Sequence, residues 1–362
     1  MHISSIINAF SQLGHFLRQF THGREPEKEA VQGNLARLNR KFHKGFSDLL
    51  EQEPVLNPWF TRENLELSLS GIAAMLEEEV LRRWLDAYDI KPIAPEERRT
   101  VGLVMAGNIP LVGFHDVLAV LSAGHRVLAR PSSKDDRLIR ELAGILQFME
   151  PDLGSRISFA EDKLSGMDAV IATGSNNSAP YFEYYFRNIP HIIRKNRNGV
   201  AVLSGKETKE ELAALGRDIF SYFGMGCRNV TKLYVPEDYD LKILLAELEN
   251  YQHLYQHHKY GNNVDYYRSI YLMNRIPILD NGVLLLKEDS STASPVGVVF
   301  YERYSDIGKV QSELEQHRPR IQCIVSIIPE IEGAILPGTT QIPMPWDYAD
   351  GVDTIRFLME LG

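Results

Sequence analysis

The chain has 362 residues, of which 44% are hydrophobic and 24% are charged, and its formal net charge is -9. Single hydrophobic cores stop growing at roughly 250–300 residues, so this length predicts two domains with a cleft between them. The acidic balance and the lack of a long basic cluster exclude nucleic-acid binding. Two distant cysteines exclude a disulfide framework and a zinc site, which predicts a reducing compartment, the cytoplasm.

Residues 1–95 are predicted to form a helical section that packs on a cofactor domain. The first residues lack the basic start and the cleavage site of a signal peptide. Their pattern predicts an amphipathic helix packed on the body of the protein, with a membrane-surface anchor as the alternative. No run reaches the roughly 18 uninterrupted apolar residues of a membrane span. One face of the helix would carry Ile3, Ile6, Ile7, Phe10, Leu13, Leu17 and Phe20.

Residues 96–204 are predicted to form an α/β domain. Short apolar runs alternate with helical patterns, which is typical of a doubly wound, Rossmann-like parallel sheet. Open sheets of this kind bind ligands at the turns that follow their strands. The runs read "TVGLVMAG", "HRVLARPSS", "ISFAE", "MDAVIATGS" and "GVAVLSG". Pro110 is well placed to start the helix after the first of these turns.

Residues 205–335 are predicted to form a second α/β domain, followed by a tail over residues 336–362. The second domain would contain a helix in "KETKEELAALGRDIFSYF", a strand in "TKLYVPED", a long helical stretch through Tyr271, and strands in "SPVGVVFYE" and "IQCIVSIIP". His253 and His257 have the spacing of a metal pair, but no carboxylate completes a site. A solvated helix face is the expected role of this stretch, which also holds His258.

The segment "FGMGCRNVTKLYVP" carries Cys227 between a helix and a strand. Thiolates are favoured near helix ends and clustered backbone amides, and Gly224 and Gly226 leave amides available to an oxyanion. A small residue that fills a gap in the core is the alternative. Cys323 lies in the apolar run "RIQCIVSII" and is expected to be an inert core thiol.

Two other turns carry candidate polar groups. Asn108 in "MAGNIPLVGFHD" is either a turn former or an amide that donates to a developing oxyanion. Gly174 and Ser175 in "ATGSNN" open either a plain capping turn or a phosphate site at the start of a helix.

Five short motifs occur in the order found in the aldehyde dehydrogenase superfamily, and residues 98–300 resemble its LuxC-type acyl-CoA reductases. "AGNIPLVGF" is similar to P-W-N-F-P-L, "VLARPSS" to K-P-S, "ATGS" to F-T-G-S, "GMGCRNVTKLYV" to G-Q-x-C-x-N, and "SPVGVVFY" to the G-P-V strand. The resemblance implies two Rossmann-like domains, of which residues 96–204 form the nucleotide-binding one, with Cys227 as the nucleophile and Asn108 as the oxyanion donor. It further implies cofactor contacts from Gly107, Arg130, Pro131, Ser132, Ser133, Thr173, Gly174 and Ser175, and no metal. With this resemblance, a lining for an acyl chain or coenzyme A is the alternative role of the stretch that holds His253, His257 and His258.

Three departures from the family pattern refine this expectation. The position of the glutamate that activates water falls near Arg194, so hydrolysis of an acyl-enzyme is expected to be slow. The glutamate that contacts the nicotinamide ribose is replaced by Ser291. Ser133, flanked by Arg130 and Lys134, stands where NAD-preferring members carry a glutamate, which favours NADPH over NADH.

The resemblance therefore implies an NAD(P)H-dependent reductase that converts an acyl-CoA or acyl-carrier-protein thioester into an aldehyde. The alternatives are aldehyde oxidation, either acylating or hydrolytic, and a non-redox acyl-transfer or acyl-binding protein. An acyl-transferring protein is a possible partner. The family's oligomerisation hairpin has no room in "DIKPIAPEERRTVGL", so its usual dimer is not assumed. The "WDYADG" tail is similar to the chain ends of LuxC-like proteins and is expected to be structural or to form a lid.

Overall fold

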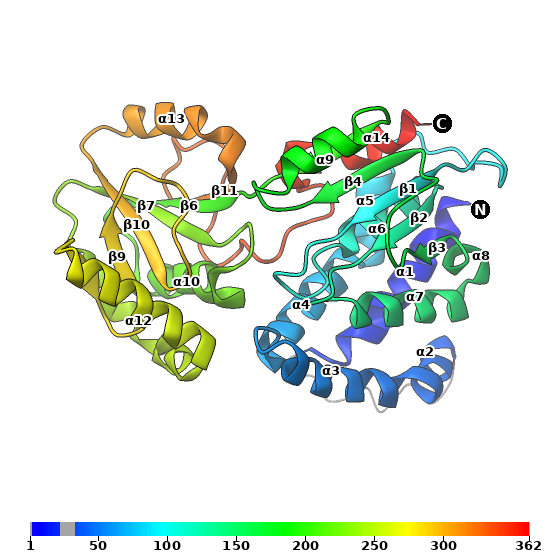
Figure 1. Cartoon of the computed structure of the whole chain (residues 1–362), viewed down its shortest axis with the longest axis horizontal. Coiled ribbons are helices and arrows are strands. Elements are labelled where there is room, and N and C mark those ends of the chain that lie inside the picture. Colours follow the sequence, from blue (N-terminus) through cyan, green and yellow to red (C-terminus); the bar gives the residue numbers. More distant parts are fainter. Residues whose placement is uncertain (1, 22–32, 362) are drawn as a thin grey trace. The chain divides into compact units, whose positions relative to one another are not determined.

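A computed structural model describes residues 2–21 and 33–361. The chain divides into two compact units (Figure 1): residues 1–195 with 343–362 form the first, and residues 196–342 form the second. Each unit contains a mainly parallel sheet with helices packed on it, so the predicted α/β fold class is confirmed. The first unit is made of two separate segments, because the chain enters the second unit and returns.

Helices precede the sheet of the first unit and share its hydrophobic core. In α1 (Ile3–Arg18), the expected apolar stripe is buried, with Ile7, Phe10 and Leu13 no more than 1% exposed. The Phe10 ring meets that of Phe114 at a centroid distance of 6.4 Å. The other elements of this section are α2 (Asn34–Leu38), the π-helix η1 (Asn39–His43), α3 (Lys44–Leu56), α4 (Arg62–Met75) and α5 (Glu78–Leu85).

The first sheet has five parallel strands in the order β3-β2-β1-β4-β5. Because helices pack against it, its strands are almost continuous apolar runs. The strands are β1 (Thr100–Val104), β2 (Arg126–Arg130), β3 (Ile157–Phe159), β4 (Ala169–Thr173) and β5 (His191–Arg194). They are joined through α6 (Phe114–Ser122), α7 (Arg137–Met149), α8 (Pro151–Gly154) and α9 (Ala179–Phe186).

The second sheet has seven strands in the order β12-β11-β6-β7-β10-β9-β8, and only the β8–β9 pair is antiparallel among them. The strands are β6 (Asn198–Val202), β7 (Val230–Pro236), β8 (Ile278–Asp280), β9 (Leu285–Glu288), β10 (Val298–Tyr304), β11 (Ile321–Ser326) and β12 (Ala334–Ile335).

The strand β6 was expected in the nucleotide-binding domain, but it pairs with β7 and β11 of the second sheet. The units therefore divide between Lys195 and Asn196 rather than at the expected boundary after residue 204. Gly199 explains the pairing locally, because its N–H donates to the carbonyl of Asn229 at 2.8 Å. A Cβ at Gly199 would lie 2.7 Å from the carbonyl oxygen of Arg228, so only glycine allows this approach.

Helices lie on both faces of the second sheet, with α13 on one side and α10 and α12 on the other (Figure 1). The helical elements of this unit are α10 (Lys209–Phe220), η2 (Ser221–Gly224), α11 (Leu241–Glu247), η3 (Leu248–Gln256), α12 (His258–Met273), α13 (Ile307–Gln316) and η4 (Arg318–Arg320). The long helical stretch expected through Tyr271 is interrupted, because His257 is extended (φ -72°, ψ 109°) and caps α12 by accepting the N–H of Tyr260.

The expected tail is shared between the two units. Residues 336–342 belong to the second unit, while η5 (Ala349–Gly351) and α14 (Thr354–Met359) return to the first. Ile355 and Leu358 of α14 are fully buried there. In the two described ranges of the chain, no helix is both long and apolar enough to cross a bilayer.

Candidate active site

The carboxyl ends of β1, β2 and β4 surround a cleft of about 520 Å³ in the first unit. Six of the eight residues expected to contact a cofactor line this cleft, which is where parallel α/β sheets bind ligands. They are Arg130, Pro131, Ser132, Ser133, Thr173 and Gly174.

The two remaining candidates, Gly107 and Ser175, lie next to residues of the cleft. A Cβ on Gly107 would lie 2.6 Å from the Cβ of Ser132, so glycine is needed for these two turns to touch. Gly174 is equally confined, because a Cβ there would lie 2.5 Å from the Oγ of Ser178. The hydroxyl of Ser175 accepts the N–H of Ser178 at 3.3 Å and so forms the turn before α9, whose N-cap residue is Ser178.

The cleft carries charges that sequence reasoning missed. Arg140 of α7 lines it together with Arg130, and its Nε donates to Asp136 at 2.8 Å. Glu161 also lines it, whereas Lys134, the second cation expected there, is not among the lining residues. Nothing in the sequence separates Arg140 from other helix-surface arginines. Glu161, however, closely follows the strand "ISF", and residues just after the strands of a parallel sheet lie at its ligand-binding edge. Its place in the cleft could therefore have been predicted.

Asn108 is exposed on the loop between β1 and α6. Two buried contacts hold the loop next to this residue. The hydroxyl of Ser68 donates to the carbonyl of Pro110 at 2.8 Å, and the N–H of Leu111 donates to the Oδ2 of Asp135 at 2.7 Å. Asp135 thus ties the Asn108 loop to the loop after β2, which lines the cleft.

The prediction that Pro110 starts a helix is wrong, because α6 begins at Phe114. Leu111 has a φ of 56°, in the left-handed region, and a right-handed helix cannot continue through it. Asp135 holds the Leu111 amide in this conformation, and no sequence motif announces that contact.

Cys227 is exposed on a tight turn between η2 and β7. The turn is organised by Asn229, whose side chain is fully buried. Its Oδ1 accepts the N–H of Gly226 at 2.7 Å, and its Nδ2 donates to the carbonyls of Asp218 and Ser221 at 2.9 Å each. One amide therefore links the end of α10 to both sides of the cysteine.

The chain approaches this turn through two buried aromatic residues in left-handed conformations. Tyr222 has a φ of 52° and Phe223 a φ of 57°, and such residues each cost about 1 kcal/mol or more unless their surroundings hold them. The Phe223 ring stacks on His257 with centroids 4.4 Å apart. His257 therefore packs and caps, and in the described part of the chain no three His, Cys, Asp or Glu side chains are grouped to hold a metal.

Residues 338–340 of the second unit are hydrogen-bonded to the turn that carries Cys227 and to the helix before it. Arg228 donates through its Nε to the carbonyl of Thr340 at 2.5 Å. The buried Asp218 accepts the N–H of Gly338 at 2.6 Å and the hydroxyl of Thr340 at 2.8 Å. Burial raises the pKa of Asp218, against the opposing effect of these donors.

Cys323 is only 7% exposed in β11, in agreement with the expected core thiol. Its Sγ lies 3.5 Å from the carbonyl oxygen of Arg228, so it packs against the turn that presents Cys227. Of the two thiols, Cys227 is the one that solvent and a substrate can reach.

Arg194, at the position where a water-activating glutamate was sought, is buried at the end of β5. A carboxylate does lie beside it, because both oxygens of Asp116 accept from the Nη1 of Arg194 at 2.7 Å. The Nη2 of Arg194 also donates to Thr354 of α14 at 3.1 Å. Asp116 is 6% exposed and engaged in this pair, so it is not available as a base.

Ser291 is exposed, and its N–H donates to the Oδ1 of Asp289 at 2.9 Å. Partial burial acts to raise the pKa of Asp289, but hydrogen bonds from Lys287 and Ser291 lower it to about 2. A permanently charged carboxylate thus stands two residues before the position where sequence reasoning found only serine.

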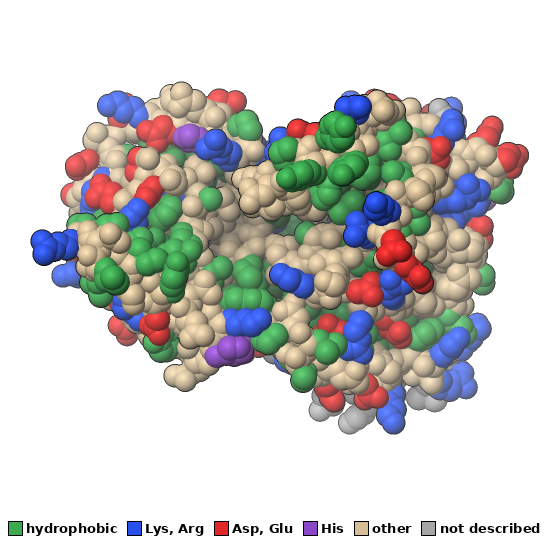
Figure 2. Space-filling view, in the orientation of Figure 1, with side chains coloured by type: hydrophobic (Ala, Val, Ile, Leu, Met, Phe, Trp, Pro, Cys, Tyr) green, Lys and Arg blue, Asp and Glu red, His purple; other side chains and the backbone are tan. Residues whose placement is uncertain are grey.

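Hydrophobic side chains gather on the surface over α9 (Figure 2). Tyr181, Tyr184 and Tyr185 are between 62% and 72% exposed, whereas Phe182 of the same helix lines the cleft. The helix therefore presents one aromatic residue to the candidate site and three to solvent.

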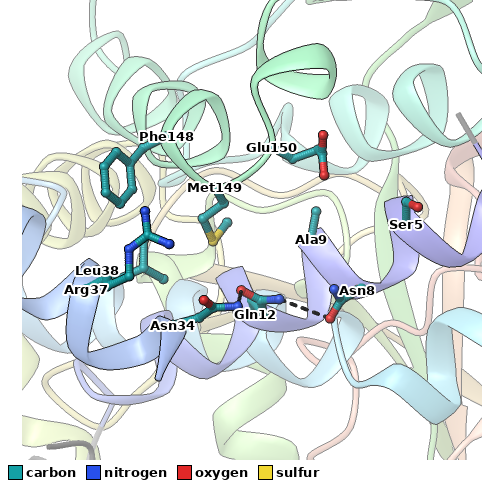
Figure 3. A pocket seen from close by; sticks show the side chains of 10 residues that line it. All are labelled: Ser5, Asn8, Ala9, Gln12, Asn34, Arg37, Leu38, Phe148, Met149 and Glu150. Atoms are coloured by element: carbon teal, nitrogen blue, oxygen red, sulfur yellow. Dashed lines mark hydrogen bonds between the residues drawn. The ribbon is translucent and has the colours of Figure 1, made fainter. Parts of the chain in front are cut away.

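A separate hollow of about 210 Å³ lies among α1, α2 and the end of α7 (Figure 3). Its walls include Gln12, which accepts from Asn34 at 3.0 Å and donates to Asn8 at 3.0 Å, and the aromatic ring of Phe148. None of the predicted site residues lines it.

No family model matches the chain, and no curated protein matches it. Solved structures do match. The chain is similar to the NAD+ complex of an aldehyde dehydrogenase from Bacillus cereus, with 10% identity, a TM-score of 0.60, and coverage of 91% of this chain and 73% of that one.

Two further solved structures are similar to the chain over most of its length. An NAD-dependent aldehyde dehydrogenase from Sinorhizobium meliloti matches with 10% identity and a TM-score of 0.62, over 91% of this chain and 72% of that one. An acetylating aldehyde dehydrogenase from Geobacillus thermoglucosidasius matches with 12% identity and a TM-score of 0.58, over 94% of this chain and 83% of that one. At these identities the likeness concerns the fold, and the predicted aldehyde-dehydrogenase-like fold is confirmed.

Proposed function

We propose that the chain is a LuxC-type acyl-thioester reductase, which converts an acyl-CoA or an acyl-carrier-protein thioester into an aldehyde. The observation that carries the proposal is the exposed Cys227, held on a tight turn by the buried amide of Asn229. The fold supports it, since NAD-dependent and acetylating aldehyde dehydrogenases are among the similar structures.

The cleft of the first unit fits a nicotinamide dinucleotide. Gly107 and Gly174 let the turns around it pack closely, because a Cβ at either position would collide with the side chain of Ser132 or Ser178. Arg130 and Arg140 supply positive charge, so we keep NADPH as the preferred cofactor, with NADH as the alternative that Glu161 favours. When bound, the cofactor supplies the hydride. Fluorescence titration with each nucleotide compares the two affinities directly.

Acyl transfer to Cys227 needs no cofactor. The thiolate attacks the thioester carbonyl, a new carbon–sulfur bond forms, and the carrier leaves as a thiol after taking up a proton. We assign to Asn108 the donation of a hydrogen bond to the oxyanion. After reduction, the thiohemiacetal on Cys227, with its oxygen as the alkoxide, re-forms the carbonyl and breaks its carbon–sulfur bond, which releases the aldehyde and restores the thiolate.

The pair formed by Arg194 and Asp116 supports reduction over hydrolysis. In this pair the carboxylate accepts two hydrogen bonds at 2.7 Å and is buried, so it is a poor base for activating water. The acyl group would then wait on Cys227 for a hydride or a second thiol. Acylating oxidation of an aldehyde is the same path in reverse, and a non-redox acyl transferase would stop before reduction. Ser291 is the feature that favours this last alternative.

The proposal assigns a role to each of the two units. The first unit would bind the nucleotide and the second would present the nucleophile. A cytoplasmic location and an acyl-transferring protein partner belong to the same proposal.

Mass spectrometry after incubation with a long-chain acyl-CoA and no nucleotide tests the first step. We expect one acyl adduct on Cys227, absent in Cys227→Ser and retained in Cys323→Ser. Addition of NADPH should remove the adduct, with loss of reduced-nicotinamide absorbance and release of aldehyde. An adduct confined to Cys323, or faster turnover of aldehyde with NAD and water, would contradict the proposal.

A further inference from the structure

Asp135 is a buried acid that the proposed reaction does not use. It lies between the loop that carries Asn108 and the loop after β2, which lines the cleft. It is 5% exposed. Its Oδ2 accepts the Leu111 N–H on the loop of Asn108, and its own N–H donates to the carbonyl of Ser132 at 2.9 Å. Ser132 lines the cleft and touches Gly107.

The surroundings of Asp135 are unsuited to a negative charge. Its second oxygen, Oδ1, is buried, and no donor within the described residues reaches it. Glu53 of α3 and Asp136 of the same loop add negative charge nearby, and Arg137 is engaged with Glu53 at 3.5 Å. Burial and these two carboxyls raise the pKa of Asp135 to about 7, although the Leu111 and Val112 amides act to lower it.

We propose that Asp135 is a positioning residue that fastens the Asn108 loop to the cofactor loop, and that it does so best as the neutral acid. The left-handed Leu111 then keeps its conformation because its amide is held. Asp135 acts through the loop and not on the substrate. The inference deepens the proposed function and rests on it for the role of Asn108.

Proton linkage fixes the sign of the effect. An opening that lets water reach the Leu111 amide also hydrates the carboxyl that the amide contacts, and returns its pKa toward the ordinary value of 3.8. The open loop therefore binds its proton less tightly than the closed loop. Between pH 6 and pH 8 the opening equilibrium should rise about tenfold, with most of the change below pH 7.5.

Hydrogen exchange of the full-length protein tests this without any ligand. After correction for intrinsic exchange rates, the amides of Ile109 and of residues 111–113 should exchange about tenfold more readily at pH 8 than at pH 6. The Asp135→Asn variant keeps an acceptor and cannot ionise, so its exchange should not depend on pH in this way. Asp135→Ala should exchange rapidly at both values.

Asp168→Asn is the matched control. Asp168 also accepts a backbone N–H at 2.7 Å, from Thr100, but it is exposed. This variant should retain the pH dependence of the wild type. If Asp135→Asn retains it too, or if the wild type shows none, the inference is overturned.

Acylation of Cys227 supplies the functional readout. The rate ratio of Asp135→Asn to wild type should be near one at pH 6 and rise toward pH 8 in proportion to the open fraction that the exchange experiment gives, while ionisation of the thiol cancels from the ratio. A ratio that does not follow this open fraction contradicts the inference. If the wild type forms no adduct at all, the proposed function fails, whereas the exchange experiment still decides the role of Asp135.

Discussion

Replacement of Asn229 by alanine should greatly lower the denaturant concentration at which the second unit unfolds. The substitution removes two hydrogen bonds to carbonyls at 2.9 Å and one from the Gly226 amide at 2.7 Å, all at a fully buried side chain. Each bond contributes about 1 kcal/mol, and a buried amide left without a partner costs about 1–3 kcal/mol. The expected loss in the free energy of unfolding is about 4 kcal/mol.

Urea titration can follow the two units separately. The three tryptophans are Trp59, Trp84 and Trp346, all in the first unit, so tryptophan emission follows that unit while far-ultraviolet circular dichroism follows both. With a urea slope of about 2 kcal/mol per molar, the circular dichroism midpoint of the second unit should fall by about 2 M. The tryptophan midpoint should fall less.

Two variants make this prediction refutable. Asn229→Asp keeps the acceptor for Gly226 but turns an oxygen toward two carbonyls, so it should be almost as destabilising as alanine. Asn262→Ala, at an exposed position of α12, should stay within about 0.5 kcal/mol of the wild type. A midpoint for Asn229→Ala within 0.5 M of the wild type, on the order of 1 kcal/mol, would refute the reasoning.

Three further outcomes are expected. Gly107→Ala should weaken nicotinamide binding at least about tenfold in a fluorescence titration, because the added Cβ would displace Ser132, which lines the cleft. Gly144→Ala, where a Cβ meets nothing within 4 Å, should bind normally, and equal affinities of the two variants would contradict the role of this packing. Arg194→Met should cost about 3–5 kcal/mol in thermal unfolding, and adding Asp116→Leu should recover much of it; a loss below 1 kcal/mol would show that the pair is unimportant. Burial lowers the pKa of His115 below 6.5, so the wild type loses stability through this group as pH falls below that value. The gap in unfolding free energy between wild type and His115→Gln should therefore shrink from pH 7.5 to pH 5, and a constant gap would contradict it.

The sequence predicted the parts of the site that depend on strand order. Turns that follow parallel strands reach the same edge of a sheet, and so Ser132 and Thr173 come together from distant segments. The same reasoning could not place β6, because an apolar strand buried on both faces reads alike in either sheet. The hairpin of β8 and β9 was missed although its Asn281 and Gly282 are a turn signal.

The remaining features of the site depend on tertiary contacts, which the sequence does not reveal. Asp135 is one of two adjacent acids in the loop after β2, and only the fold shows that it, and not Asp136, is buried against Leu111. Asn229 was part of a recognised motif, but its bonds to the end of α10 depend on a kink through Tyr222 that no local preference predicts.

The return of the chain to the first unit has a consequence during biosynthesis. A nascent protein emerging from the ribosome would have all five strands of the first sheet available long before α14, which supplies the buried Ile355 and Leu358 and the hydroxyl of Thr354 for Arg194. Until that helix emerges, an apolar surface and a buried ion pair stay uncovered, so the half-made protein is the form that would need a chaperone.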